Sequence, residues 1–338
     1  MHLLIIAPSW VGDILISNSL MRHLKKQYPE VTLDVFVPAY AKDLIEAMPE
    51  VNYPLLSPLK HGELSLKKRY ALSQQLKKKH YDAAYILPNS FKSALIPFFA
   101  NISKRIGYVG EWRYPLLTET RPLDITRYPL MVERYNALAY PPGTDPTILN
   151  TLYPHLVLSK EAVDLTLTKF SLATPYIVLC PGAEYGPAKR WPHYHYATLA
   201  NHLNQQGYPV VLLGSKKDQS VGQAIIRENT YSKAVFDLTG NTSLKEAIAI
   251  IQSAHAVVSN DSGLMHVAAA LDKPLIALFG PTSPKFTPPL SQKAQVLRLI
   301  EGFEKIRVSQ DSQEGYHQSL IDLSPEKVKE ALDHALKQ

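Results

Sequence analysis

Residues 256–271, AVVSNDSGLMHVAAAL, give the clearest indication of the fold class. The first four residues, 256–259, form the short, largely apolar run that is typical of a buried strand. A polar turn follows, and residues 264–271 then repeat apolar side chains at the spacing of a helix. A strand that passes through a short turn directly into a helix is a building unit of parallel α/β sheets.

The turn between this strand and this helix is suited to an anion. Asp261 or Ser262 is expected to cap the helix, and Gly263 allows a ligand to approach the backbone. The free amides of the first turn and the helix dipole attract negative charge. His266, one turn into the helix, is expected to point at the same anion. The alternative is a turn that only caps its helix, with His266 packed beside it.

Strand and helix patterns alternate through both halves of the chain. In the second half, strands are predicted at 176–180, 210–213, 256–259 and 275–279, and helices at 195–206, 243–252 and 263–271. In the first half, strands are predicted at 3–7, 31–37 and 83–87, and a helix at 14–26. Near-continuous apolar strands between helices indicate parallel sheets covered on both faces. Each half is therefore predicted to be a Rossmann-like domain.

The length of 338 residues suggests two domains, because a single hydrophobic core rarely grows beyond about 250–300 residues. Residues 140–146 are rich in turn formers, and the polar stretch 159–174 precedes the first strand of the second half. We therefore expect an N-terminal domain over 1–165 and a C-terminal domain over 166–323, followed by a helix within 324–338.

The chain has a formal net charge of +6, which favours anionic partners such as nucleic acid, phosphorylated small molecules or an anionic lipid surface. It has no nucleic-acid reading motif and no long basic arm, and its lysines lie mostly in helical stretches such as 67–79. Nucleic acid is therefore not expected as a partner.

Cysteine content and hydropathy indicate the compartment. The single cysteine, Cys180, excludes an internal disulfide framework and a cysteine-based zinc cluster, as is usual in a reducing compartment. The apolar run at 3–7 is too short for the core of a signal peptide, and no stretch reaches the roughly 18 apolar residues of a spanning helix. We expect a cytoplasmic protein without a transmembrane segment.

A second loop, PGAEYGPAKRWP at 181–192, follows the predicted strand at 176–180. Ligands of open α/β sheets bind at the carboxyl ends of the strands, so this loop and the turn at 260–263 are expected to face one crevice. Lys189 and Arg190 would supply a point charge and a bidentate fork, a pair suited to a diphosphate that leaves. The alternative is a solvated surface pair.

The first half has its own strand-to-helix turn, PSWVGD at 8–13. It lacks the G-x-G-x-x-G spacing of dinucleotide sites, so a nicotinamide cofactor is not expected. Asp13 is suited to cap the helix at 14–26 or, if this edge faces the phosphate site, to deprotonate an acceptor hydroxyl as a general base. Partial burial would tune its pKa for that role.

The segment LPNSFKS at 87–93 also follows an apolar strand. We expect its Asn89, Ser90 and Lys92 to contribute to an acceptor site, with helix capping by Asn89 or Ser90 as the alternative. The histidine-rich stretch at 193–195 lacks a cysteine or carboxylate set at metal-ligand spacing, so no metal site is predicted.

Six motifs follow one another in order: SWVGD at 9–13, LPNSFKS at 87–93, MVERY at 131–135, PGAEYGPAKRWP at 181–192, NDSGLMH at 260–266 and GYHQSL at 315–320. Together they resemble the bacterial lipopolysaccharide heptosyltransferases of glycosyltransferase family 9, nearly from end to end. The resemblance implies a GT-B architecture, α/β, in which two Rossmann-like domains with parallel sheets face a central cleft. It implies that the C-terminal domain binds the donor, that the N-terminal domain binds the acceptor, and that the helix at 324–338 can pack back on the N-terminal domain.

The resemblance also implies a reaction. An inverting transfer would move L-glycero-D-manno-heptose from ADP-heptose to the first heptose of the inner core on Kdo-lipid A, and inversion needs one general base. Asp13 and Lys189 match the family's catalytic positions, the base and the lysine near the donor phosphate. The residues that match or are assigned to donor binding are Lys189, Arg190, Asp261, Ser262, Gly263, His266, Thr242 and Asp218, the last two at the adenosine end. Those assigned to acceptor binding are Trp10, Asn89, Ser90 and Lys92.

One departure concerns the branch, because family members that add the first heptose commonly carry Thr where this chain has Ser262. This favours the branch that adds the second heptose. The resemblance implies that no metal or other cofactor is required, since protein cations and helix dipoles take that role. It also implies peripheral association with the cytoplasmic face of the inner membrane of a Gram-negative bacterium. The basic and aromatic groups expected to meet acceptor phosphates or lipid are Arg105, Trp112, Arg113 and Arg134.

Three alternatives stay open at this level, because fold does not fix function. One is another family 9 heptosyltransferase that adds the first or third heptose. A second is a sugar-nucleotide epimerase or hydrolase on the same fold. The third is a nucleotide-sugar-binding protein without catalysis, against which the intact set of Asp13, Lys189 and His266 argues.

Overall fold

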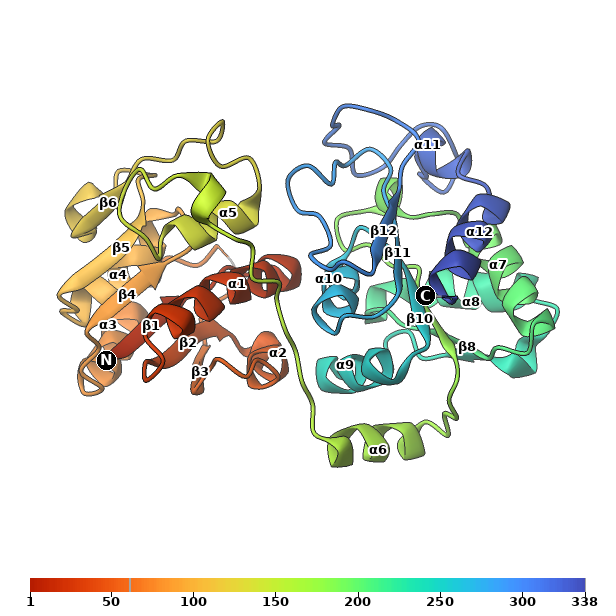
Figure 1. Cartoon of the computed structure of the whole chain (residues 1–338), viewed down its shortest axis with the longest axis horizontal. Helices are drawn as coiled ribbons and strands as arrows, with labels where there is room; N and C mark the ends of the chain where they lie inside the picture. Colours follow the sequence, from red (N-terminus) through yellow and green to blue (C-terminus); the bar gives the residue numbers. More distant parts are fainter. Residues whose placement is uncertain (61, 338) are drawn as a thin grey trace. The chain divides into compact units, whose positions relative to one another are not determined.

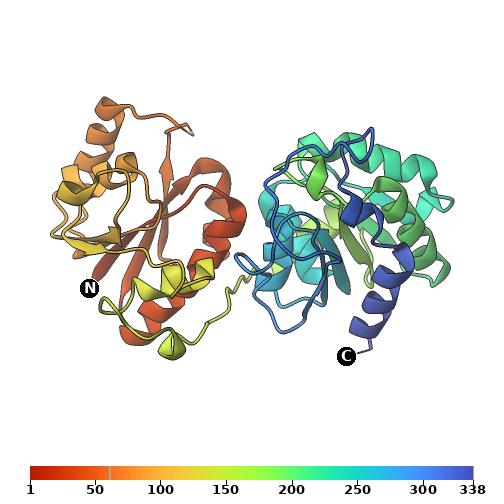
Figure 2. The same cartoon turned by 90° about the horizontal axis from the view of Figure 1, so that it is seen from above.

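The computed structural model describes residues 1–60 and 62–337. The chain divides into two compact units, unit 1 over Met1–His155 and unit 2 over Leu156–Gln338 (Figure 1). Each unit is a parallel sheet with helices on both of its faces (Figure 2). The predicted α/β class with two parallel sheets is confirmed.

In the described part of unit 1, six parallel strands form a sheet in the order β3-β2-β1-β4-β5-β6. The strands are β1 (His2–Ile6), β2 (Thr32–Pro38), β3 (Tyr53–Ser57), β4 (Ala83–Ile86), β5 (Lys104–Tyr108) and β6 (Glu119–Arg121). The helices are α1 (Val11–Gln27), α2 (Lys42–Glu46), α3 (Leu66–Lys77), α4 (Phe91–Phe99) and α5 (Met131–Ala137), with 3₁₀ turns η1 (Ala39–Ala41), η2 (Tyr114–Leu116) and η3 (Pro146–Ile148). Helix α1 packs on α5, and α3 packs on α4.

Unit 2 repeats this plan, and its described residues form six parallel strands in the order β12-β11-β10-β7-β8-β9. The strands are β7 (Ile177–Cys180), β8 (Val210–Leu212), β9 (Val235–Asp237), β10 (Ala256–Asn260), β11 (Leu275–Leu278) and β12 (Ala294–Leu297). The helices are α6 (Lys160–Lys169), α7 (His193–Gln205), α8 (Gln219–Glu228), α9 (Leu244–Ser253), α10 (Gly263–Ala270), α11 (Gln318–Ile321) and α12 (Pro325–Ala335), with η4 (Pro187–Lys189), η5 (Lys216–Asp218) and η6 (Ser232–Ala234).

The strand order places the two predicted loops of each unit side by side. In unit 1, β1 pairs directly with β4 at the centre of the sheet. Strands β2 and β3 continue the sheet beyond β1, and β5 and β6 continue it beyond β4. In unit 2, β7 and β10 are neighbours in the same way. Such a reversal of strand order opens a crevice at the carboxyl ends, where ligands of this fold bind. The loops after β1 and β4, and those after β7 and β10, therefore lie at the two reversal points.

Burial explains why the central strands were predictable. Strands β7, β10 and β11 are buried along their whole length, as parallel strands with helices on both faces must be. Their side chains form one core with those of α7. Trp191, just before this helix, and Tyr196, within it, are fully buried in that core. This core fixes the floor of the loops that follow β7 and β10.

Two expectations about domain limits differ from the structure. The division falls at His155 rather than near residue 165, because α6 packs against α9 of unit 2. The last helix, α12, is capped by Ser324, whose side chain accepts a hydrogen bond from the Lys327 amide. Its buried residues, among them Leu332, belong to the core of unit 2, so the helix is part of that unit. The apolar face of α12 packs into the core of unit 2, and this packing fixes the position of the helix.

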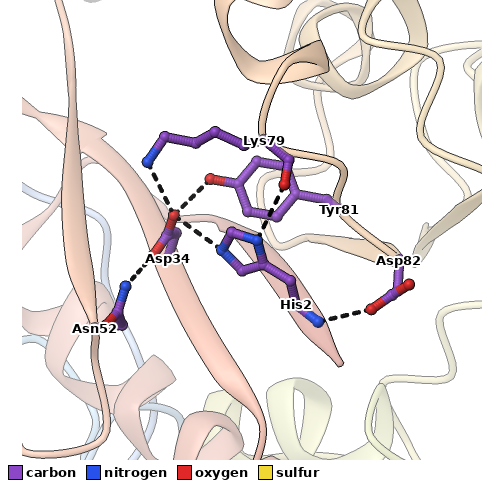
Figure 3. Close-up of polar contacts among 6 residues, drawn as sticks. All are labelled: His2, Asp34, Asn52, Lys79, Tyr81 and Asp82. Carbon is purple, nitrogen blue, oxygen red and sulfur yellow. Dashed lines mark hydrogen bonds and ion pairs between the residues drawn. The ribbon is translucent and has the colours of Figure 1, made fainter.

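Near the amino ends of the unit 1 strands, a polar cluster surrounds the buried carboxylate of Asp34 (Figure 3). Tyr81 donates to it at 2.6 Å, His2 Nε2 and Lys79 Nζ lie within 3.3 Å of it, and Asn52 donates to its other oxygen at 3.0 Å. Burial acts to raise the pKa of Asp34, but these donors outweigh it and lower the pKa overall. The cluster joins β1 and β2 to the segments that lead into β3 and β4, at the edge away from the predicted loops.

Among the described residues, no helix is both long enough and apolar enough to cross a membrane.

Candidate functional site

Asn260, the last residue of β10, joins the two loops at the reversal point of unit 2. Its side chain is fully buried. Its Oδ1 accepts hydrogen bonds from the Trp191 amide at 3.0 Å and from the Tyr196 hydroxyl at 3.1 Å, and its Nδ2 donates to the Pro181 carbonyl at 2.8 Å. From sequence, Asn260 is predicted only to belong to the turn before α10. An amide at the end of an otherwise apolar strand was the available signal.

Lys189 and Asp261 meet at this edge as an ion pair. Lys189 Nζ lies 2.6 Å from Asp261 Oδ2, and the side chains are only 15% and 11% exposed. Thr282, which follows β11, donates to the same oxygen at 2.7 Å. Residues that follow three neighbouring strands thus form one polar group, as their positions at the carboxyl edge predict. Thr282 was not among the predicted residues.

Arg190 and Asp218 form a second pair. Arg190 Nη2 lies 3.1 Å from Asp218 Oδ1, while Asp218 Oδ2 accepts from the amide and hydroxyl of Ser215 at 2.9 and 2.7 Å. Gly182 lies so close to this carboxylate that a Cβ atom there would overlap it. Asp218 therefore ties the loop after β8 to the loop after β7. Asp218 is predicted to bind the adenosine end of the donor. In the structure its carboxylate is already bound to Arg190 and Ser215.

The turn into α10 does not have the predicted cap. Ser262 occupies the N-cap position, but its side chain makes no capping hydrogen bond. Its hydroxyl lies 3.3 Å from that of Ser259, and Asp261 is turned toward Lys189 instead. The prediction that Asp261 or Ser262 caps the helix is therefore wrong. The reason is that Asp261 pairs with Lys189 and the Ser262 hydroxyl lies beside that of Ser259, which leaves the amides at Gly263 without a side-chain acceptor from the turn.

His266 lies in the first turns of α10 and is buried. Burial lowers its pKa to about 4, with Asp261 opposing this shift and Lys189 adding to it. The imidazole is therefore neutral near neutral pH. It can donate or accept a hydrogen bond, but it brings no positive charge to an anion.

Thr242 lies farther along the same edge, after β9 and before α9. The neighbouring Ser243 caps α9 and receives a reciprocal bond from Glu246. Among the described residues, no hydrogen bond joins Thr242 to the pairs around Lys189 and Asp218. The structure therefore brings together seven of the eight predicted donor residues near β7, β8 and β10, and places Thr242 beyond β8.

In unit 1, Asp13 lies in the first turn of α1, because this helix begins at Val11 and so earlier than predicted. Trp10 holds the N-cap position, so the capping alternative for Asp13 is wrong. Within residues 1–60 and 62–337 the Asp13 carboxylate makes no hydrogen bond or ion pair. Burial raises its pKa to about 6. A carboxylate without a partner and with a raised pKa is suited to accept a proton.

The loop after β4 is organised by a buried arginine. Arg113 is fully buried, and its guanidinium donates to the carbonyl oxygens of Pro88 and Tyr108 and to Asn89 Oδ1 and Ser93 Oγ. It therefore has no free face for an acceptor phosphate or a lipid, contrary to our expectation. A single arginine in a loop gives no sign in sequence that it will be enclosed by the chain around it.

Neither Asn89 nor Ser90 caps α4. Ser90 is at the N-cap position without a capping bond, and Glu111 accepts from the Phe91 amide at 2.8 Å instead. Asn89 is exposed and Ser90 and Lys92 are half-buried, so all three have accessible surface at this edge. The capping alternative is thus wrong for both residues.

Of the other predicted side chains of unit 1, the two tryptophans are exposed and the two arginines are held by backbone carbonyls. Trp10 is 53% and Trp112 is 86% exposed, so both rings can meet a ligand or a surface. Arg105 donates to the Leu116 carbonyl and Arg134 to the Tyr128 carbonyl, and these bonds hold each guanidinium against backbone.

Comparison with known proteins extends over the whole chain. The family model described as glycosyltransferase family 9 (heptosyltransferase) matches residues 69–317. Lipopolysaccharide heptosyltransferase 2 of Escherichia coli K12 is 52% identical over an alignment of 346 positions, which covers 100% of this chain and 99% of that protein. Lipooligosaccharide heptosyltransferase 2 of Haemophilus influenzae is 50% identical, with 99% of each chain covered. The solved structure of E. coli ADP-heptose lipopolysaccharide heptosyltransferase II has a TM-score of 0.90 at 49% identity and covers 100% of this chain and 99% of its own.

Proposed function

The chain belongs to glycosyltransferase family 9, the heptosyltransferases, and we propose that it transfers heptose from ADP-heptose to the inner core of lipopolysaccharide. It is a glycosyltransferase with a GT-B-like fold. The observation that carries the proposal is the group formed by Lys189, Asp261 and Thr282 beside the start of α10, at the reversal point of the unit 2 sheet.

Unit 2 binds the donor in this proposal. A diphosphate placed at the first turn of α10 would receive hydrogen bonds from backbone amides and a favourable dipole interaction. Lys189 would pair with its charge as the bond to the sugar breaks. Neutral His266 would donate a hydrogen bond rather than a charge, in keeping with its lowered pKa. Arg190 would contact the same diphosphate, and we assign Asp218 and Thr242 to the adenosine end by their position along the same edge.

The Asp13 carboxylate acts as the general base. It would take the proton from the attacking hydroxyl of the acceptor while the anomeric carbon inverts, in a single displacement. A pKa of about 6 leaves the carboxylate ionised at neutral pH and makes it more basic than an ordinary aspartate. Trp10, Asn89, Ser90 and Lys92 bind the acceptor.

The acceptor is the first heptose of the core on Kdo-lipid A, so that this enzyme adds the second. Two relatives that share half of their residues with this chain are named heptosyltransferase 2, and Ser262 agrees with that branch. Transfer of the first or third heptose is the alternative. Such an acceptor is anchored in lipid, so we further propose that the enzyme works at the cytoplasmic face of the inner membrane, to which its net charge of +6 would attract it.

One experiment tests donor, acceptor and reaction together. The purified enzyme is incubated with ADP-heptose and a core acceptor that carries one heptose, and the products are weighed by mass spectrometry. We expect a gain of one heptose and release of ADP, with an α linkage by NMR. An acceptor without heptose should give no product. Release of ADP without any acceptor would support the hydrolase alternative instead.

The variant Asp13→Asn separates catalysis from binding. Loss of a general base lowers turnover by roughly a hundredfold to ten thousandfold. Binding of ADP by unit 2 should not change, which calorimetry can measure. Full turnover in the variant would remove Asp13 from the mechanism and leave the donor assignment standing.

A further inference from the structure

The loop between β12 and α11 lies against the loop that carries Lys189. The Ala188 amide donates to the Arg307 carbonyl at 3.0 Å. This approach requires a glycine at position 186, because a Cβ on Gly186 would overlap the same carbonyl oxygen. Arg307 is therefore fixed by its backbone to the loop of the donor site, although it lies 118 positions after Lys189 in the sequence (307 − 189 = 118).

The ring of Tyr185 brings the Arg307 side chain to the same place. Arg307 Cζ lies 5.0 Å from the centre of this ring, and Lys189 Nζ lies 5.9 Å from it. The face of an aromatic ring attracts cations within about 6 Å of its centre. Tyr185 is half-buried, and its ring is a platform to which both cationic groups are held.

Over residues 1–60 and 62–337, the two predicted cations of the donor site, Lys189 and Arg190, are already neutralised by carboxylates, and Arg307 is not. Lys189 is paired with Asp261 and Arg190 with Asp218, so these four groups together carry no net charge. Arg307 is exposed, and in the described part of the chain no carboxylate forms an ion pair with it. Its positive charge is therefore available to a ligand.

We propose that Arg307 is a further donor-binding residue that contacts the diphosphate of the nucleotide sugar. This assignment rests on the proposed function of unit 2 as the donor-binding unit. The planar guanidinium offers two parallel N–H donors, which match two oxygens of a phosphate. Tyr185 holds the guanidinium in place beforehand, so less side-chain freedom is lost when the diphosphate binds.

The test compares binding of ADP and AMP to Arg307→Gln and to the native protein by calorimetry. Loss of a charge-assisted contact should weaken ADP binding about tenfold. The effect on AMP should be smaller, because AMP lacks the second phosphate. Lys305→Gln is the matched control, since Lys305 is an exposed cation two positions away in the same loop. This control should bind ADP as the native protein does.

A second pair of variants tests the aromatic platform. Tyr185→Leu removes the ring and should weaken ADP binding roughly threefold, as expected for an exposed cation–π contact. Tyr185→Phe keeps the ring and should bind ADP normally.

The outcomes separate this inference from the function on which it rests. If the native protein fails to bind ADP, the proposed donor site is wrong. If the native protein binds ADP and Arg307→Gln binds it equally well, Arg307 has no part in donor binding. Equal weakening of ADP and AMP would also overturn the inference, because it would place Arg307 away from the second phosphate.

Discussion

The ammonium group of Lys189 lies 2.6 Å from a carboxylate oxygen of Asp261, so the cation predicted to neutralise a leaving diphosphate already has a counter-ion. Thr282 donates to the same oxygen and holds it in place. Both side chains of the pair are largely buried, so removal of either partner leaves a charge that is poorly solvated. A diphosphate that enters the site must compete with Asp261 for Lys189.

We expect this pair to show strong energetic coupling. Lys189→Met leaves the Asp261 charge unpaired and should lower the free energy of unfolding by about 3 kcal/mol. The double variant with Asp261→Asn removes both charges and should recover about 1 kcal/mol or more of that loss. Urea unfolding of the native, single and double variants measures the coupling. If the losses in unfolding free energy of the two single variants add up in the double variant, Lys189 and Asp261 do not stabilise each other.

The rate should depend on pH through Asp13. Burial raises the pKa of this carboxyl to about 6, and the ionised form is the base. The value of kcat/KM should therefore rise as pH increases through about 6 and become level above it. Initial rates between about pH 5 and 8 measure this profile, with donor and acceptor below their KM values. A rate that stays constant across this range would contradict the assignment.

Ionisation of the buried Asp13 carboxyl should make the folded protein less stable at neutral pH than at acidic pH, as far as this group contributes. Its pKa is about 6 when folded against a reference of 3.8, so the folded state favours the protonated form. The corresponding contribution to stability is complete below about pH 3.8 and is lost as pH rises through about 6. Asp13→Asn stays neutral and should be more stable than the native protein near pH 7.5, by at most about 3 kcal/mol. Near pH 4 the gain should disappear, which chemical denaturation at both pH values can establish.

Arg113 should matter for folding more than for ligand binding. Arg113→Met removes the guanidinium donor of the Tyr108 carbonyl and one of the two side-chain donors of the Pro88 carbonyl, which should lower the free energy of unfolding by about 3 kcal/mol. Lys104→Met removes an exposed cation from the same unit and should change stability by less than about 0.5 kcal/mol. Thermal and urea unfolding compare the two. A fully stable Arg113→Met protein would show that the loop after β4 does not depend on the guanidinium.

The sequence predicts the central strands and the helices α1, α3, α7, α9, α10 and α12, and the strands that it misses share a physical cause. Strands β1, β2, β4, β7, β8, β10 and β11 are apolar runs covered on both faces. Strands β3, β6, β9 and β12 lie at the edges of the two sheets and β5 lies beside an edge. Several of them are short or carry polar side chains, because an edge strand is less enclosed. Their pairing was set by the sheet and not by their own pattern.

The amino-acid pattern alone is enough to predict the two parallel α/β sheets, the loops that hold the candidate site and the residue types in them. Those features follow from local periodicity and from the rule that parallel strands end at one edge. The tertiary structure decided which predicted groups carry a free charge. It paired Lys189 with Asp261, left His266 neutral, enclosed Arg113 and brought Arg307 to Tyr185. Burial and charge pairing depend on segments far apart in the chain, so no local pattern records them.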